Sequence, residues 1–187
     1  MLLAGTPIVL NALVINSNNQ AQYTNASGNL SVTTAHLAGK DALVIEGIFV
    51  STSSGDAISV NLSNIALKRL AIESVNVSQF STLGLNIQLT NVSGLESVAI
   101  EDVSTVGPSR GLNLTFDNTD TNSLTIDDST FPGVTITARN GADVNNGVVT
   151  GNRISAPSGI EGIVLNVLST PPTLSAPGLP KRRSTCG

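Results

Sequence analysis

The sequence predicts an all-β fold, a single-stranded right-handed parallel β-helix of about six coils with 22–30 residues in each. Three observations lead to this prediction. A short strand pattern with alternating apolar residues recurs along the chain, a second family of strands shares its period, and no window has helical periodicity. One such coil cannot bury its apolar face alone, so successive coils must stack.

The first strand family has apolar residues at every second position and a polar residue seven places after its first residue. Alternation of this kind predicts strands with one buried face. The five copies begin 27, 27, 22 and 29 residues apart, and they occupy 57–64, 84–91, 111–118, 133–140 and 162–169.

Four copies of this family end in asparagine. Asparagine tolerates the left-handed backbone conformation that a tight corner needs. Stacked asparagine side chains can also hydrogen-bond to one another along a rod. We therefore expect a structural asparagine ladder made of Asn64, Asn91, Asn118 and Asn140.

The second strand family alternates with the first, and from residue 43 onward its copies are 27, 28, 26 and 24 residues apart. Its members are 13–16, 43–45, 70–72, 98–100, 124–126 and 148–149. A weaker apolar pair follows most members, so one period holds about three short strands. The residues of this third group are Ile48 with Val50, Val75 with Val77, Val103 with Val106, and Ile154 alone.

A leucine-rich repeat is the main competing architecture. Segments 67–72 and 95–100 fit its Leu-x-x-Leu-x-Leu pattern, but Val75 and Val103 stand where that repeat has asparagine. Its convex side also needs a helix, whereas this chain has a second strand family there. The β-helix is the better interpretation.

The composition restricts the class of protein. Of the 187 residues, 12% are charged and 3% aromatic, and the net charge of −4 gives no reason to expect a nucleic-acid partner. No apolar stretch has the roughly 20 residues of a membrane-spanning helix. A surface of Ser, Thr and Asn is common in secreted and cell-surface proteins, and we expect that setting, with an export signal outside this sequence.

Three segments are expected along the chain. Residues 1–7 form an N-terminal lead-in and residues 8–169 form the β-helix domain. Residues 170–187 are rich in proline and contain three consecutive basic residues, 181–183. Proline interrupts strand pairing, so we expect this last segment to be a disordered tail.

Residues 148–155 have the sequence Val-Val-Thr-Gly-Asn-Arg-Ile-Ser. This stretch resembles the apolar-x-Gly-Asn-x-Ile unit of right-handed parallel β-helix repeats in the pectin-lyase-like superfamily, and as a pattern the resemblance covers about residues 8–169. That superfamily includes polysaccharide lyases and hydrolases, phage tailspikes and non-catalytic repeats of bacterial extracellular proteins. The resemblance implies the fold and an extracellular setting, and the non-catalytic bacterial type fits best.

An acidic column is the most regular polar feature. Its members, each directly after the last isoleucine of a second-family strand, are Glu46, Glu73, Glu101 and Asp127. Stacked about 4.8 Å apart, two carboxylates repel by roughly 0.9 kcal/mol in water. A bound Ca²⁺ would relieve this repulsion, because it prefers several oxygen ligands. The alternative is a solvated edge without a cation, and no other cofactor is expected.

Catalysis has weaker support. Asn118-Thr119-Asp120 and Asp127-Asp128 superficially resemble polygalacturonase motifs, but they lie 7 residues apart instead of one coil. The Gly-His-Gly and Arg-x-Lys motifs of those enzymes are absent, and the candidate bases Arg110, Arg139 and Arg153 occupy different places in the repeat. We therefore predict no catalytic residue.

The predicted function is a non-catalytic structural or adhesive segment that contacts an extracellular glycan or surface weakly. Few aromatic rings are available to stack on sugars, and Tyr23 and Phe80 are the expected surface candidates. The alternative is a fragment or relative of a pectate- or alginate-type lyase or hydrolase. End-to-end self-association is also expected, because terminal coils expose sheet edges.

Overall fold

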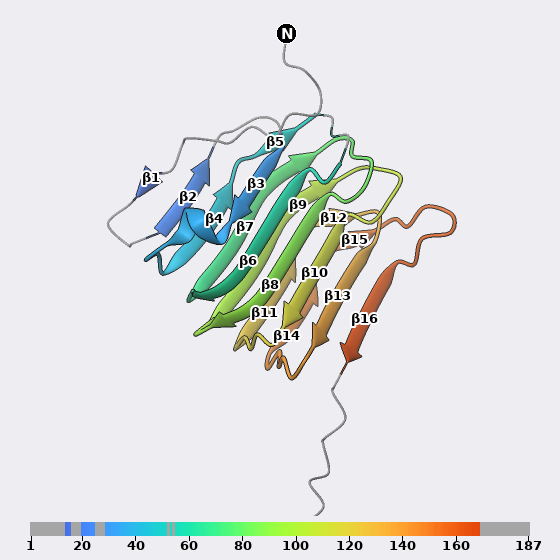
Figure 1. Cartoon of the computed structure of the whole chain (residues 1–187). Coiled ribbons are helices and arrows are strands. Elements are labelled where there is room, and N and C mark those ends of the chain that lie inside the picture. The colour runs from blue at the N-terminus through green and yellow to red at the C-terminus, as the bar shows by residue number, and fades with distance from the viewer. Residues whose placement is uncertain (1–13, 16–19, 25–28, 52, 54, 169–187) are drawn as a thin grey trace, which may run out of the picture.

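The computed structural model describes residues 14–15, 20–24, 29–51, 53 and 55–168. Within them the chain is a parallel β-solenoid of about five coils with essentially no helix. A six-stranded sheet and a ten-stranded sheet face each other, and apolar side chains fill the space between them (Figure 1). The predicted all-β solenoid is thus confirmed.

The six-stranded sheet contains the first strand family and is parallel throughout. Leu85 stacks on Leu112, and Leu112 stacks on Val134, so equivalent residues of successive coils lie in register. In spatial order its strands are β3 (Leu30–Thr33), β6 (Ile58–Ala66), β8 (Leu85–Ser93), β10 (Leu112–Asp117), β13 (Val134–Arg139) and β16 (Ile163–Leu168).

The ten-stranded sheet contains the second family and bends into a third, short face. Its main path is β1 (Val14–Ile15), β2 (Gln20–Thr24), β4 (Ala42–Glu46), β7 (Arg69–Val77), β9 (Ser97–Thr105), β11 (Ser123–Asp127) and β14 (Gly147–Thr150). The short face contains the last residues of β7 and β9 together with β5 (Phe49–Val50), β12 (Thr130–Phe131) and β15 (Arg153–Ile154).

The first predicted member of the second family is wrong. Val14 and Ile15 pair antiparallel with Gln22 and Ala21, so β1 does not stack as a coil. The strand that stacks in parallel on β4 is β2, whose pattern is mostly polar. The solenoid has about five coils, and β2 takes the place in the stack that was predicted for β1.

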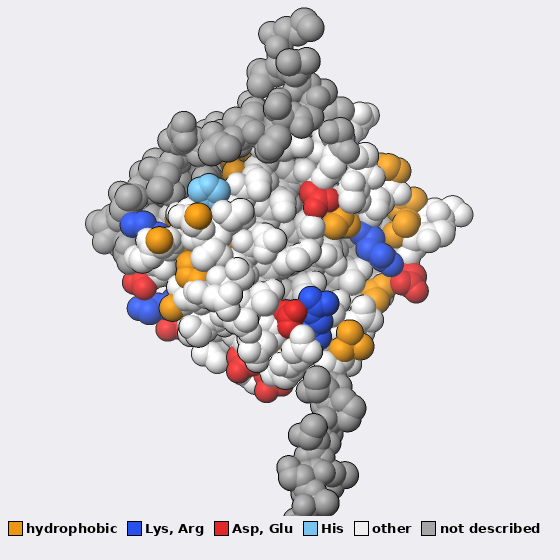
Figure 2. All heavy atoms as spheres, viewed as in Figure 1, with side chains coloured by type: hydrophobic (Ala, Val, Ile, Leu, Met, Phe, Trp, Pro, Cys, Tyr) orange, Lys and Arg blue, Asp and Glu red, His pale blue; other side chains and the backbone are white. Residues whose placement is uncertain are grey.

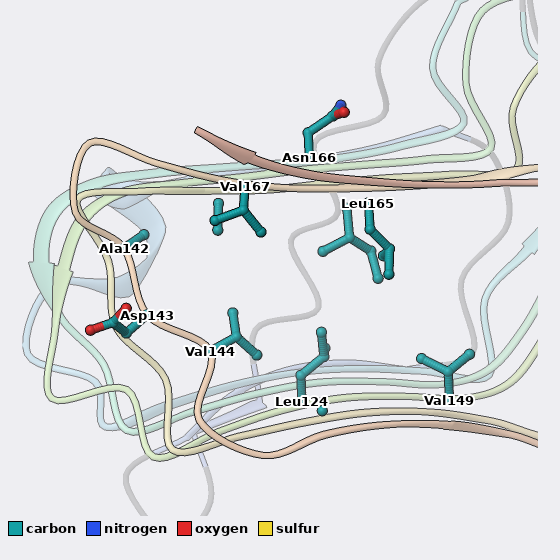
Figure 3. Close-up of a pocket in the computed structure, with 11 residues that line it drawn as sticks. Leu124, Ala142, Asp143, Val144, Val149, Leu165, Asn166 and Val167 are labelled. Carbon is teal, nitrogen blue, oxygen red and sulfur yellow. The ribbon is translucent and has the colours of Figure 1, made fainter. Parts of the chain in front are cut away.

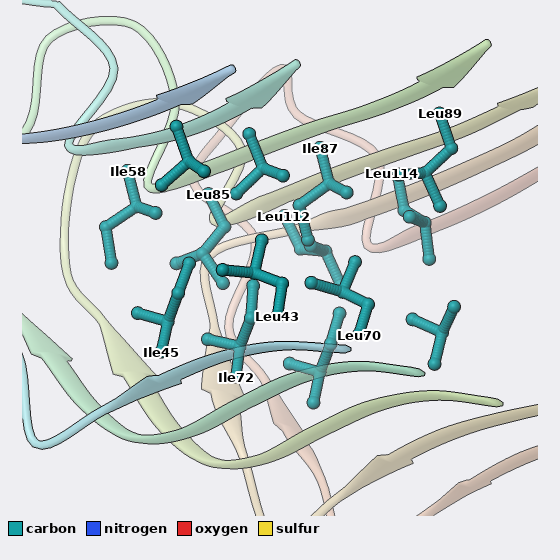
Figure 4. Close-up of a cluster of buried hydrophobic side chains, with 14 of the residues drawn as sticks. Leu43, Ile45, Ile58, Leu70, Ile72, Leu85, Ile87, Leu89, Leu112 and Leu114 are labelled. Carbon is teal, nitrogen blue, oxygen red and sulfur yellow. The ribbon is translucent and has the colours of Figure 1, made fainter. Parts of the chain in front are cut away.

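The core is a continuous column of mostly aliphatic side chains between the two sheets. Ile87 and Leu114 point from the six-stranded sheet toward Leu70 and Ile72 of the opposite sheet, and all four are fully buried (Figure 4). Burial of each such side chain stabilises the fold by about 1.5–3 kcal/mol. The alternation read from the sequence therefore identifies the inward positions correctly.

Buried hydroxyl groups replace aliphatic side chains in the coil that begins at β10. Thr119 is 1% exposed, and its Oγ1 donates to the Leu89 carbonyl at 3.1 Å and accepts from the Val92 N–H at 3.0 Å. Ser129 Oγ likewise donates to the backbone carbonyl of Asp127 and accepts from the Val103 N–H. Each hydroxyl satisfies backbone groups at a corner, so its burial is not costly.

The leucine-rich repeat is excluded, because a sheet lies where that architecture needs its helices. Among the described residues, the helical structure is limited to the short 3₁₀ segment η1 (Thr34–Leu37). No helix in the described part of the chain has the length and apolarity needed to cross a bilayer. The predicted boundaries at residues 7–8 and 169–170, and the tail 170–187, lie outside the described residues.

Candidate functional site

The asparagine corners stack as a hydrogen-bonded ladder. The φ angles of Asn64, Asn91 and Asn118 are 52°, 51° and 48°, all left-handed. Asn91 Nδ2 donates to Asn64 Oδ1 at 3.0 Å, and Asn118 Nδ2 donates to Asn91 Oδ1 at 2.7 Å. Each of these asparagines thereby forms the left-handed corner of its own coil, and its side chain hydrogen-bonds to the corner of a neighbouring coil.

Asn140 departs from the predicted ladder. Its φ of 57° places it at the equivalent corner, but its Nδ2 donates to Asp117 Oδ1 at 2.6 Å instead of to Asn118. Asp117 is the last residue of β10, and its carboxylate is a stronger hydrogen-bond acceptor than the amide of Asn118. The hydrogen-bonded ladder thus contains three asparagines.

Replacing Asn91 separates the two roles of the ladder. Asn91→Ala loses both ladder hydrogen bonds. It also places alanine, which cannot hydrogen-bond locally, in a left-handed conformation. We therefore expect the free energy of unfolding to fall by about 2 kcal/mol. Asn91→Gly keeps the corner relaxed and should lose about 1 kcal/mol less. Urea unfolding of both variants measures the difference, and equal losses would contradict a conformational role for the corner.

Asp117 joins the end of the ladder to an ion pair. Arg139 Nη2 lies 2.8 Å from Asp117 Oδ2, and Arg139 Nε donates to the same oxygen at 2.9 Å. The Asn140 hydrogen bond is the main cause that lowers the pKa of Asp117 below its ordinary value of 3.8. Desolvation opposes this effect, and the hydrogen bond and charge of Arg139 add to it.

A lowered pKa makes Asp117 a source of acid sensitivity. Its contribution to stability is complete above the unfolded-state pKa of about 3.9 and is lost as the pH falls through the lower folded-state pKa. We therefore expect Asp117→Asn to be less stable than the wild type at pH 7 and the difference to shrink below about pH 4. Urea midpoints between pH 7 and pH 3 test this, and a constant difference would contradict it.

The acidic column lies in register along the ten-stranded sheet. Glu46 pairs with Glu73, Glu73 with Glu101, and Glu101 with Asp127. Arg69 Nη2 lies 2.9 Å from Glu73 Oε1, and Thr150 Oγ1 donates to Asp127 Oδ1 at 2.7 Å, so neighbouring side chains hold these two carboxylates. In the described part of the chain, no three His, Cys, Asp or Glu side chains gather closely enough to hold a metal ion.

A second left-handed corner directly follows the acidic column. It is formed by Ser74, Asp102 and Asp128, with φ of 52°, 52° and 46°, and by Gly151 in the next coil. Ser74 Oγ donates to Asp102 Oδ2 at 3.0 Å. A Cβ at Gly151 would meet Asp128 Oδ1, so a larger residue there would displace that carboxylate.

The calcium site stays a prediction. If a cation bridges the carboxylates that stack in register, millimolar Ca²⁺ should raise the melting temperature. The effect should disappear in Glu101→Gln, which removes one charge from the middle of the column. A melting temperature that does not change with Ca²⁺ would leave the solvated edge as the explanation.

The outward face of the six-stranded sheet is polar and almost without charge, as Figure 2 shows for the view in which this sheet lies in front. We call it the polar face. Its charged pair Asp117–Arg139 lies at the ends of β10 and β13. The other outward residues also lie in register. One column contains Ser31, Ser59, Asn86 and Asn113 and continues into Thr135, which is only 9% exposed, and Val164, and a second contains Thr33, Asn61, Gln88, Thr115, Thr137 and Asn166. Ser63 and Thr90 lie in register with Asp117.

A second asparagine pair on the polar face was missed by the sequence analysis. Asn113 Nδ2 donates to Asn86 Oδ1 at 3.0 Å, and Asn86 Nδ2 donates to Asp56 Oδ2 at 2.7 Å. The signal was present, because Asn86 and Asn113 each follow the first apolar residue of a first-family strand. The polar face therefore presents ordered amides and hydroxyls.

The residues considered for catalysis have other partners or lie on different faces. Arg110 Nη2 is 3.2 Å from Glu161 Oε2, and Arg139 is held by Asp117. Asn118 lies at the asparagine corner, whereas Asp127 ends a strand of the ten-stranded sheet. The Asn-Thr-Asp and Asp-Asp segments thus occupy two different corners of one coil.

The aromatic surface candidates also change. Phe80 is only 3% exposed, because its ring packs beneath Gly107, where an added Cβ would lie 2.6 Å from it. Phe49 of β5 is instead 50% exposed. The side chain of Tyr23 lies outside the described residues.

Comparison with models of protein families, with curated proteins and with solved structures finds no match to this chain.

Proposed function

We propose that the chain is a non-catalytic structural or adhesive segment of a secreted or cell-surface bacterial protein. It acts as a rigid spacer whose polar face contacts glycans or other hydroxyl-rich surfaces weakly. This polar face, nearly uncharged from β3 to β13, is the observation that carries the proposal. The pectin-lyase-like resemblance of the sequence supports the same setting.

The spacer role follows from the register. The six strands of the six-stranded sheet span five interstrand spacings, which is about 24 Å at 4.8 Å each. Each coil shares its apolar column and its backbone hydrogen bonds with the coils on either side, so bending would break several contacts together. End-to-end self-association would extend such a spacer.

The adhesive role follows from the chemistry of the polar face. Amides and hydroxyls both donate and accept hydrogen bonds, as the hydroxyls of a polysaccharide do. They recur about every 4.8 Å across the strands and about every 6.8 Å along each strand. Individual hydrogen bonds to solvent-exposed groups are weak, but a repeated array gains from multivalency on a repeated surface.

Retention on insoluble neutral polysaccharides such as cellulose and chitin tests the adhesive role. A triple variant, Gln88→Ala, Thr115→Ala and Thr137→Ala, removes three stacked polar side chains from the polar face. Its control, Ser97→Ala, Ser123→Ala and Thr125→Ala, removes three hydroxyls from the outer side of the opposite sheet. We expect the wild type and the control to be retained and the first variant to be released. Equal behaviour of both variants, or no retention of the wild type, would overturn this role.

The enzymatic alternative, a relative of polysaccharide lyases or hydrolases, has a direct test. The chain is incubated with polygalacturonate and with alginate, and unsaturated products and reducing ends are measured. We expect no turnover. Turnover that is lost in Asp127→Ala or in Arg139→Ala would establish the enzyme and overturn the proposed function.

A further inference from the structure

The last coil leaves apolar side chains uncovered. In β16, the inward residues Leu165 and Val167 are 67% and 80% exposed, although their neighbours in register on β13, Ile136 and Ala138, are both 9% exposed. In each inner coil, the side chains at these positions are covered by the coil that follows. At β16, no further described coil does so.

A cavity opens at the same end. It has a volume of about 380 Å³ and lies between β14 and β16, where Leu165 and Val167 face Leu124, Val144 and Val149 across the gap (Figure 3). A second cavity of about 220 Å³ lies beside it, lined by residues that include Ile163. We call this apolar surface, formed by β14, β16 and the two cavities, the open end.

The open end also presents unpaired sheet edges. Among the described strands, β14 pairs only with β11, and β16 pairs only with β13. Neither strand contains a charged residue or proline, the features with which proteins usually protect an edge. The occupant must therefore supply both apolar side chains and backbone hydrogen-bonding groups. A strand does this, and a small apolar ligand does not.

The opposite end of the solenoid has its apolar side chains covered, although β3 also pairs with a single described strand, β6. Leu30 and Val32 of β3, the first strand of the six-stranded sheet, are 2% and 0% exposed. On the other sheet, β1 crosses β2 in the antiparallel direction and occupies its edge. Head-to-tail stacking would need a second open end, and the described residues provide only one.

We propose that two copies of the chain join open end to open end about a two-fold axis, with β16 antiparallel to β16 of the second copy. Such an isologous contact uses the same surface twice and closes at a dimer. The segment 147–168 supplies 22 residues, within the range of roughly 20–30 residues a side in a stable interface. The strands β14 and β16 bring no charge into the contact, and the charged residues of this segment, Arg153 and Glu161, are exposed and lie outside these two strands.

The dimer goes beyond the proposed spacer function, since it doubles the length of the rod and holds two polar faces on one particle. Light scattering during size-exclusion chromatography of the full chain tests it. We expect a mass of about twice 19.1 kDa that falls to the monomer on dilution. Leu165→Lys should give the monomer at every concentration. Thr115→Lys adds the same charge to the polar face away from the open end and should leave the dimer intact.

Cysteine cross-linking decides the geometry. In a Cys186→Ser background, Asn166→Cys places a thiol near the middle of β16, and Ser31→Cys places one on β3 at the opposite end. We expect disulfide-linked dimers from Asn166→Cys alone and none from Ser31→Cys. Cross-links that form only when the two variants are mixed would overturn the proposal in favour of head-to-tail stacking. A mass that stays at the monomer, or grows beyond the dimer, would also overturn it, whatever the polysaccharide assays show.

Discussion

Replacing Gly84 with alanine is expected to lower the free energy of unfolding by about 3 kcal/mol, the upper part of the range for overpacked sites. Gly84 lies directly before β8, where the chain passes close to the next coil. A Cβ there would lie 2.6 Å from the Gly111 carbonyl oxygen and 2.9 Å from Thr105 Cγ2. The first of these contacts is to backbone, so the coils must separate to admit a methyl group.

Gly55→Ala is the matched control for this prediction. Gly55 lies in the loop before β6, where a Cβ would meet no atom within 4 Å, and its φ is not left-handed. The change should leave stability unaltered or raise it by about 0.4–1 kcal/mol. Urea unfolding of the two variants gives the comparison. If both variants lose the same unfolding free energy, the close approach of the coils at Gly84 does not determine the effect of the substitution.

Phe116→Ala is expected to cost about 3–5 kcal/mol, because it removes a fully buried ring from the centre of the core. Phe116 stacks between Leu89 of β8 and Ala138 of β13. The small Ala138 leaves room for the ring, and no neighbour can expand to fill the space if the ring is lost. Thermal and urea unfolding measure the loss.

Two further variants serve as controls for Phe116→Ala. Phe116→Leu restores the side chain that β8 has at the equivalent position and should recover more than half of the loss. Phe49→Ala removes the same ring from a half-exposed position of β5 and should cost about 1 kcal/mol or less. A small effect of Phe116→Ala would mean that the core is loosely packed at this coil.

Much of the fold could be predicted because the same chemistry recurs at each coil. Ile87, Leu89 and Leu114 alternate with polar residues, and all three are fully buried. A constant period also fixes register, which is why Glu73 and Glu101 could be placed side by side before any coordinates were known. Left-handed corners were predictable where asparagine marks them.

The short face was predicted less completely, because some of its inward residues are hydroxyls, although Ile48, Val50, Val75, Val77 and Val103 are buried. Val106 was expected to point inward, but it is 57% exposed, and Thr105 takes the inward position with 1% exposure. Ser129 is buried in the same way. Such hydroxyls are accommodated by backbone groups of a neighbouring coil, and these partners become visible only in three dimensions.

The candidate site was predicted in outline and missed in detail. The sequence placed Asn140 at a corner, but only the structure shows that Asp117 lies closer to its amide than the next asparagine does. Phe80 was expected at the surface because its segment has no strand pattern, yet it packs under Gly107. Side-chain partners of this kind depend on loop paths, which have no period.

The difference between the two ends of the solenoid has a consequence for how the molecule comes apart. Each coil touches only its immediate neighbours, so unfolding can start at a terminus and advance one layer at a time. The layer containing β14 and β16 shares its side chains with a neighbour on one side alone, and it should fray first. Pairing with a second copy would seal this weak terminus, so that assembly and resistance to unravelling rise together.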